Sequence, residues 1–255
     1  ACYKGHAACA RAMLRAGANK ETHEVKGWTP LHAACEHGAV ECMQELLEAG
    51  ADLEAVNVQG WTPLIGACFK GHEACALALL AAGADFQRAN ADGWTALIVA
   101  AQHGRYNCVR ALLDAGAKVD AANSLGWTPL ISASHKGHDA CTLALLEAGA
   151  NVNAANHDGW TALLAAAQHG HGNCVRALLA AGANTEAANK LGWTPLFIAC
   201  QNGHQPIVRN LLRAGASWRV RSNTNKTPLA AARSRRFAAI VRLLVDAEAG
   251  RLPPA

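Results

Sequence analysis

Cysteine has the widest chemical repertoire of any residue type in this chain, because a thiolate can bind metal, form disulfides or act as a nucleophile. The 255 residues include ten cysteines, and all ten fall at two positions of a 33-residue spacing. The first set is Cys9, Cys42, Cys75, Cys108, Cys141 and Cys174, and the second is Cys2, Cys35, Cys68 and Cys200. Isoleucine continues the first set at Ile207, and alanine replaces cysteine in the second at Ala101. Both positions are therefore predicted to be buried packing positions, where a thiol behaves as a small apolar side chain.

Disulfide and redox roles are the alternatives for these thiols. Successive members of one set lie one helix row apart, about 8–10 Å, which exceeds the ~7 Å Cα separation that a disulfide allows. A pair such as Cys35 and Cys42, within one repeat, remains open to such a role. So many free thiols predict an intracellular reducing compartment, either the cytoplasm or an organelle interior.

Twelve histidines raise the alternative of a metal site. Six of them flank a glycine that recurs every 33 residues: His37, His103 and His169 precede it, and His72, His138 and His204 follow it. Zinc needs three or four ligands about 2 Å from one ion, whereas residues one helix row apart diverge. These histidines are expected to have structural, surface or partner-contacting roles, and no metal or cofactor is predicted. No phosphate-binding loop, nucleophile elbow or acid–base pair stands out, so the chain is not predicted to be an enzyme.

A different glycine begins a longer motif that recurs with the same spacing. Gly-Trp-Thr-Pro/Ala-Leu recurs at 33-residue intervals, beginning at Gly27, Gly60, Gly93, Gly126, Gly159 and Gly192, and a seventh copy reads Asn225-Lys226-Thr227-Pro228-Leu229. We predict one repeat domain over residues 1–255, made of a partial repeat (1–26), six full repeats (27–59, 60–92, 93–125, 126–158, 159–191, 192–224) and a capping repeat (225–255). Because the chain opens inside a predicted helix without Met, it is expected to be a fragment of a longer protein with a genuine C-terminal cap.

Each repeat predicts two antiparallel helices. In the third full repeat, Thr95 begins the first helix as its N-cap, and Gly104 ends it in the left-handed conformation. A second helix with an apolar stripe from Cys108 to Leu113 follows and ends at Gly116. The polar segment after it predicts a turn or short hairpin. One such unit cannot bury enough apolar surface alone, so the copies are predicted to stack into an all-α repeat solenoid.

The residues now on the page resemble the ankyrin-repeat family, whose mark is a 33-residue period with the pattern T-P-L-H-x-A. Residues 29–34 match this pattern in full, and Gly71-His72 and Gly137-His138 match the family's Gly-His at the second helix. The resemblance covers essentially the whole chain and implies a stack of antiparallel helix pairs joined by β-hairpin-like loops. It departs at the pattern's histidine, which is replaced by an apolar residue that is expected to be buried. These residues are Ile65, Ile98, Ile131, Leu164 and Phe197.

The resemblance also implies where a partner binds. Ankyrin-like proteins hold partners in the groove between their hairpin tips and the exposed side of the first helices. The corresponding tip residues are Trp28, Trp61, Trp94, Trp127, Trp160 and Trp193, and the corresponding helix residues include Phe69, Lys70, His103, Lys136 and His169. An indole combines a large apolar area with an N–H donor, which suits a binding surface. The alternative is that each Trp rigidifies its neighbour's tip, and both roles remain open.

Charge is distributed unevenly along the chain. Residues 192–255 hold ten Lys/Arg against Asp246 and Glu248, a net of +8, whereas residues 1–191 carry a net of −4. The candidate basic surface is Arg219, Arg221, Lys226, Arg233, Arg235 and Arg236. Such an end attracts acidic proteins, phosphates or anionic membranes, although a solvated capping repeat gives the same pattern. Nucleic acid is not expected as a ligand, because no aromatic-rich groove accompanies the charge.

Together these features predict a non-catalytic scaffold that binds a protein partner through its concave face and hairpin tips, or a peripheral subunit of a multi-subunit complex. The alternatives are a targeting arm of an enzyme whose catalytic domain lies outside this sequence, and a binder of phosphate-rich ligands through the basic end. No run of 18 apolar residues predicts a membrane-spanning helix, which leaves peripheral membrane association open. The chain is expected to be monomeric by itself.

Overall fold

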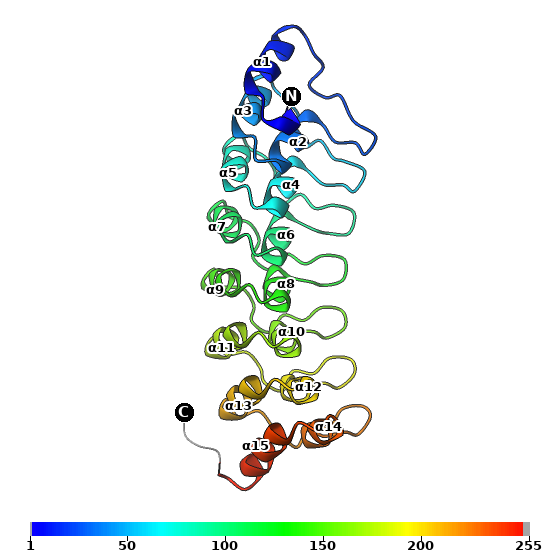
Figure 1. Ribbon diagram of the computed structural model, residues 1–255, viewed down its shortest axis with the longest axis vertical. Coiled ribbons are helices and arrows are strands. Elements are labelled where there is room, and N and C mark those ends of the chain that lie inside the picture. The colour runs from blue at the N-terminus through cyan, green and yellow to red at the C-terminus, as the bar shows by residue number, and fades with distance from the viewer. Residues whose placement is uncertain (1, 252–255) are drawn as a thin grey trace. The chain divides into compact units, whose positions relative to one another are not determined.

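The computed structural model describes residues 2–251, which form two compact units built from repeated helix pairs (Figure 1). Unit 1 ends at Ser124 and unit 2 begins at Leu125. The helices of unit 1 are the 3₁₀ helix η1 (Cys2–Lys4), α1 (Ala7–Arg15), α2 (Pro30–Glu36), α3 (Val40–Glu48), α4 (Pro63–Lys70), α5 (Glu73–Ala81), α6 (Ala96–Gln102) and α7 (Tyr106–Asp114). Those of unit 2 are α8 (Pro129–Lys136), α9 (Asp139–Glu147), α10 (Ala162–His169), α11 (Gly172–Ala180), α12 (Pro195–Asn202), α13 (Gln205–Arg213), α14 (Pro228–Ser234) and α15 (Ala238–Glu248).

Threonine begins every first helix from α2 to α14, as predicted. The Thr62 hydroxyl accepts the backbone N–H of Ile65 at 3.3 Å, which satisfies one of the donors that a helix start leaves open. Proline occupies the first turn of five of these helices, α2, α4, α8, α12 and α14, where its missing N–H costs nothing. The predicted stops are also confirmed, because Gly104 and Gly116 adopt φ of +67° and +89°.

Each unit has two helix layers. In unit 1 the first helices α2, α4 and α6 pack in sequence, and α3, α5 and α7 pack behind them. In unit 2 the corresponding layers are α8, α10, α12 and α14, and α9, α11, α13 and α15. The loops project away from the second-helix layer in each unit (Figure 1). This arrangement confirms the all-α repeat solenoid, since within residues 2–251 the only β pairings are the single bridges Ala89–Thr95 and Ala155–Thr161.

Most of the cysteines are buried in this stack. The eight from Cys35 to Cys200 are buried, whereas Cys2 is half-buried and Cys9 is exposed. All are free thiols in the part of the chain that the structure describes, so the predicted packing role fits eight of the ten. Among the helices over residues 2–251, none combines the length and apolar character needed to cross a bilayer.

Candidate functional site

An asparagine side chain holds the tip of the loop before α4, α6, α10 and α12. The Asn57 side-chain oxygen accepts the backbone N–H groups of Gln59 and Trp61 at 2.9 and 3.0 Å, and the Trp61 carbonyl accepts the Asn57 N–H in return. Asn90, Asn156 and Asn189 hold Trp94, Trp160 and Trp193 in the same way. The Trp backbone is thus fixed by another residue's side chain, and the indole is left to face outward.

Neighbouring tips inside a unit are joined edge to edge. In unit 1 the Val58 N–H donates to the Lys26 carbonyl at 3.1 Å, and in unit 2 the His157 N–H donates to the Leu125 carbonyl at 3.0 Å. The spacing between tips leaves no room for a side chain on Gly126, since a Cβ there would lie 2.9 Å from the Asn156 Cα. The glycine that precedes the tip tryptophan therefore sets how closely adjacent tryptophans approach one another.

Unit 1 holds a groove of about 720 Å³ between two tips and two first helices. Trp61 and Trp94 come from the tips, Phe69 from α4, and Gln102 and His103 from the end of α6. The Phe69 ring lies 5.1 Å from Trp61 and 4.5 Å from His103, both edge to face. The structure thus brings together four of the predicted partner-binding residues and adds Gln102.

The groove offers donors as well as apolar surface. Trp61 and Trp94 are half-buried, and their indole N–H groups bond to nothing within residues 2–251 and remain open to solvent. An exposed indole can donate a hydrogen bond and cover an apolar side chain together. The groove is therefore suited to a polypeptide, which brings carbonyl acceptors and apolar side chains.

Lys70 contributes less charge to this surface than its sequence position suggests. Its ammonium group lies 3.1 Å from a Glu36 carboxylate oxygen and 5.2 Å from the centre of the Phe69 ring. Glu36 occupies in α2 the position that Phe69 has in α4, and its pairing with Lys70 of the next repeat could not be predicted from spacing alone. The pair leaves this part of unit 1 nearly neutral.

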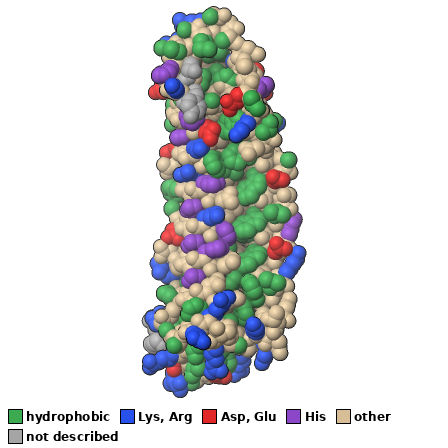
Figure 2. Space-filling view, turned by 45° about the vertical axis from the view of Figure 1, so that its right-hand side comes forward, with side chains coloured by type: hydrophobic (Ala, Val, Ile, Leu, Met, Phe, Trp, Pro, Cys, Tyr) green, Lys and Arg blue, Asp and Glu red, His purple; other side chains and the backbone are tan. Residues whose placement is uncertain are grey.

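In unit 2, His135 stands at the position that Phe69 has in unit 1, and it takes part in an aromatic row. His135 lies 5.1 Å from Trp127 and 4.4 Å from His169. Burial, followed by the nearby His169, Lys136 and His171, lowers the pKa of His135 to about 4. The ring is consequently neutral at pH 7, and Figure 2 shows histidine side chains (purple) lying beside hydrophobic ones (green) on this face.

The histidines that follow the recurrent glycine have a different role. His72, His171 and His204 place Nε2 at 2.9–3.1 Å from a carbonyl oxygen of the preceding repeat, that of Glu36, His135 and Gln168 respectively. A carbonyl only accepts, so each Nε2 carries the proton and donates it. Arg105 makes the equivalent bond to the Phe69 carbonyl at 3.1 Å. Sequence reasoning left His171 out of this group, although its position 33 residues before His204 was the available signal.

The histidine of the T-P-L-H pattern joins two repeats. His32 is buried, its Nδ1 lies 2.9 Å from the Thr29 hydroxyl, and its Nε2 lies 2.8 Å from the Trp61 carbonyl. Burial lowers the pKa of His32. Ile65, Ile98, Ile131 and Leu164 are buried at the same position, so apolar packing replaces this link elsewhere, as expected.

The predicted basic residues are exposed on the last repeats. Arg219 stacks on Trp218, with the guanidinium carbon 4.4 Å from the ring centre, and Arg221 donates to the Asn225 carbonyl at 3.1 Å. Arg219, Arg221, Lys226, Arg233, Arg235 and Arg236 form no ion pair with any carboxylate in the described part of the chain. In Figure 2 the Lys and Arg side chains (blue) gather at the lower end, over these repeats.

Most of the buried thiols are poor nucleophiles, although a hydrogen bond with Cys68 lowers the pKa of Cys108. Burial raises the pKa of Cys75 to about 11 and that of Cys200 to about 12. A hydrogen bond with Cys108, together with burial, raises the pKa of Cys68 well above its ordinary value. A protonated thiol neither attacks substrates nor ligates metal readily. No group of three or more His, Cys, Asp and Glu side chains within residues 2–251 is placed to hold a metal ion.

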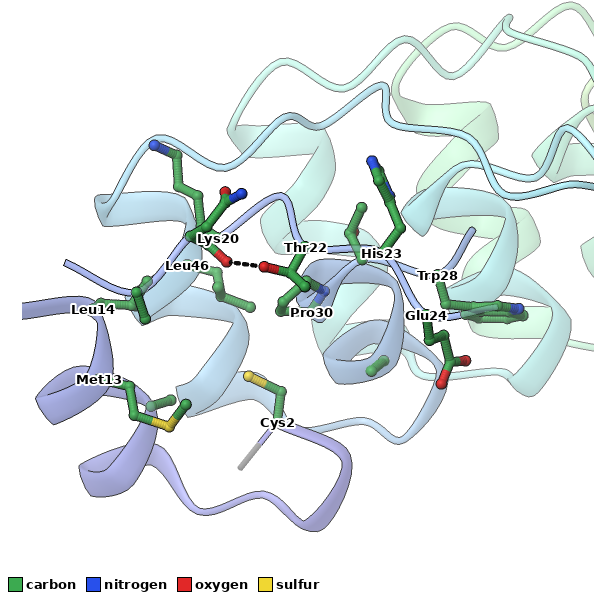
Figure 3. A pocket seen from close by; sticks show the side chains of 15 residues that line it. Cys2, Met13, Leu14, Lys20, Thr22, His23, Glu24, Trp28, Pro30 and Leu46 are labelled. Atoms are coloured by element: carbon green, nitrogen blue, oxygen red, sulfur yellow. Dashed lines mark hydrogen bonds between the residues drawn. The ribbon is translucent and has the colours of Figure 1, made fainter. Parts of the chain in front are cut away.

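A second cavity, of about 340 Å³, lies at the start of unit 1 (Figure 3). Met13, Leu14, Leu46 and Pro30 line it, and beside them the Thr22 hydroxyl donates to the Asn19 carbonyl at 2.8 Å. Pro30 is half-exposed here, whereas proline at the same position of α4 is buried against α2. The cavity arises because only the three-residue η1 stands in the first-helix place before α2 among the described residues.

Comparison with known proteins was made by sequence and by fold. The family profile described as "Ankyrin repeats (3 copies)" matches residues 1–90, 83–156, 120–189 and 144–222. The ankyrin repeat domain of human ASB11 superposes with a TM-score of 0.78 at 29% identity, over 84% of this chain and 97% of that one. The ankyrin repeat domain of Bcl-3, a member of the IkappaB family, superposes with a TM-score of 0.73 at 33% identity, over 85% of this chain and 99% of that one. Comparison with curated protein sequences gives no match.

Proposed function

Because the chain belongs to the ankyrin-repeat family, whose repeats are general protein–protein interaction modules and typically non-catalytic, we propose that it is a scaffold that holds a protein partner. The partner lies across the hairpin tips and the exposed side of the first helices. The observation that carries this proposal is the groove of unit 1, where Trp61, Phe69 and Trp94 present apolar faces and unbonded indole donors side by side.

The other expectations join this proposal. The scaffold works as one continuous domain of residues 1–255, is monomeric by itself, and serves a single client or a larger complex as a peripheral subunit. Its eight buried free thiols support a reducing compartment as the place of work. The proposed binding surface includes Trp28, Lys70 and His103 in unit 1, and Trp127, Lys136, Trp160, His169 and Trp193 in unit 2.

Trp94→Ala is expected to weaken partner binding by at least about tenfold, equivalent to about 1.4 kcal/mol. The substitution removes a half-buried indole and its open donor but leaves Asn90 to hold the loop backbone. Isothermal titration with the partner gives the affinity, and urea unfolding gives the stability, which should fall by only about 1–2 kcal/mol.

Tyr106→Ala is the matched control, since Tyr106 is an exposed aromatic residue at the start of α7, in the second-helix layer. A photoreactive amino acid at the exposed tip position Gln59 should crosslink the partner, and one at Tyr106 should not. Equal crosslinking at both places, or a stability loss for Trp94→Ala with unchanged affinity, would assign the tryptophans a purely structural role.

A further inference from the structure

The last repeat changes the chemistry of the proposed binding surface from aromatic to cationic. Lys226 stands where the preceding repeats have Trp160 and Trp193, and Arg235 stands where they have His169 and Asn202. The tip that carries Lys226 is joined directly to its neighbour, because the Asn223 N–H donates to the Leu191 carbonyl at 3.1 Å. The cations therefore continue the aromatic row of unit 2 without a gap.

Arg236 is held in a conformation that disfavours arginine. It occupies the position of the recurrent glycine and adopts φ of +60°, in the left-handed region where a Cβ is strained. In earlier repeats the next repeat also excludes a side chain here, as at Gly137, where a Cβ would lie 2.4 Å from the His171 ring. The last described repeat has no such neighbour, so the space is open, yet the backbone strain remains. A charged residue retained at a strained position points to a role outside folding.

A third position of the repeat changes from an acidic to a basic side chain between Glu186 and Arg219. Glu21, Glu54 and Glu186 each accept a backbone N–H of the following repeat, at 2.7–3.0 Å. Arg219 stands at the same position of the next repeat, stacked on Trp218 and exposed. A position that is acidic or neutral in the earlier repeats, where Gln87 and Asn153 also stand, is thus occupied in the last repeats by a cation that faces solvent.

These cations form no ion pair with a carboxylate in the described part of the chain, including Glu186, whose carboxylate accepts the Ser217 N–H close to Arg219 in sequence. The carboxylates in residues 192–251 are Asp246 and Glu248, and Asp246 already lies 3.1 Å from Arg251 and 4.0 Å from Arg242. Unpaired like charges repel one another, so their clustering is best satisfied by an external anion. We call Arg219, Lys226, Arg235 and Arg236 the basic cap.

On the basis of the proposed function, we infer that the partner's bound segment is an acidic stretch of polypeptide, with Asp or Glu side chains seated on the basic cap and apolar side chains on the neighbouring tryptophans. Guanidinium groups bind carboxylates through paired hydrogen bonds, which gives this end of the surface both affinity and direction. The inference therefore fixes the orientation of the segment as well as its composition.

The charge distribution favours a polypeptide over a phosphate chain. Residues 125–191 contain three basic residues, Lys136, Arg176 and Lys190, against four acidic ones, Asp139, Glu147, Asp158 and Glu186. A nucleic acid carries charge along its whole length and needs cations throughout its path. A polymer that is anionic at one end and apolar elsewhere therefore matches a surface whose net positive charge is confined to the last repeats.

The test is a selection of short random peptides displayed against the immobilised full chain. Acidic residues are expected to cluster at one end of the enriched peptides. The triple variant Lys226→Gln, Arg235→Gln, Arg236→Gly should weaken the best peptide by about tenfold or more in fluorescence anisotropy. Arg209→Gln is the matched control, since Arg209 is an exposed, unpaired cation on α13, and it should change the affinity by less than about twofold.

Arg236→Gly alone separates binding from folding. It should leave the melting temperature unchanged or raise it, because glycine relieves the left-handed strain, and it should still weaken the acidic peptide. A fall in melting temperature would mean that Arg236 only stabilises the C-terminal end of α14, and the inference would fail.

Three further outcomes would overturn the inference. The first is a selection that enriches no peptides, or only peptides without acidic residues. The second is an affinity that the triple variant leaves unchanged. The third is binding of oligothymidylate or of phosphatidylserine-containing vesicles that is tighter than binding of the peptide. Trp193→Ala distinguishes this inference from the proposed function. If the selected peptides are neutral and Trp193→Ala weakens their binding, the proposed scaffold function holds and the acidic partner does not. If acidic peptides bind equally well to Trp193→Ala, the result argues against the tryptophan surface.

Discussion

Gly126→Ala is expected to lower the free energy of unfolding by about 3 kcal/mol. Two costs add at this position. The residue adopts φ of +80°, which costs alanine about 1–2 kcal/mol. The new Cβ would also lie 2.9 Å from the backbone of Asn156 and His157 in the adjoining tip, which cannot move without breaking the bond between Leu125 and His157.

Gly149→Ala isolates the first cost, so the difference between the two variants gives the second. Gly149 has nearly the same φ, +82°, but a Cβ there would meet nothing within 4 Å. Its loss should therefore be about 1–2 kcal/mol, from backbone strain alone. Urea unfolding followed by circular dichroism measures both variants, and equal losses would show that contact between tips contributes nothing to stability.

Acidification from pH 6.5 to pH 5 is expected to cost unit 2 on the order of 1 kcal/mol through His135 alone, because the half-buried ring is partly screened by solvent. The pKa of His135 is about 4 in the folded chain, below the ordinary value of 6.5, so the folded state binds this proton less readily than the unfolded state. The contribution to stability is complete above pH 6.5, and it is lost progressively as the pH falls toward 4. The positive groups facing the ring are His169, Lys136 and His171.

His135→Gln is the variant that tests this contribution, because glutamine is polar, similar in reach and does not titrate in this range. Urea midpoints measured at several values between pH 7 and pH 5 should fall more steeply for the native chain than for the variant. His169→Gln should flatten the profile less, since its ring is more exposed. Parallel profiles for the native chain and His135→Gln would place the folded-state pKa of His135 near its ordinary value.

The repeat register and helix ends could be predicted from sequence because they depend on neighbours within a few residues. Thr62 caps its helix through a residue three positions away, and Gly116 ends a helix through its own backbone freedom. The chain repeats these local instructions, so each copy reinforces the interpretation of the others. The fold class followed from that redundancy.

Contacts between repeats were harder to anticipate. Lys70 forms an ion pair with Glu36 rather than remaining free. The Cys68 thiol is hydrogen-bonded to the Cys108 thiol of the next repeat rather than to a cysteine of its own hairpin. Such pairs depend on the rotation and rise between repeats, which spacing in the sequence does not specify. The groove of unit 1 could be located from the Trp row, but the edge-to-face contact of Phe69 with His103 of the next repeat could not.

The tip asparagines have a consequence for how recognition can change. Since Asn57 holds the loop through backbone groups, the outward side chain is free to vary without altering the loop. The last repeat already demonstrates this freedom: Ser222 replaces asparagine, Lys226 replaces tryptophan, and the Ser222 hydroxyl still accepts the Lys226 N–H at 3.3 Å. Ligand preference can therefore be rewritten one repeat at a time, by evolution or by design, while the architecture that displays it is inherited unchanged.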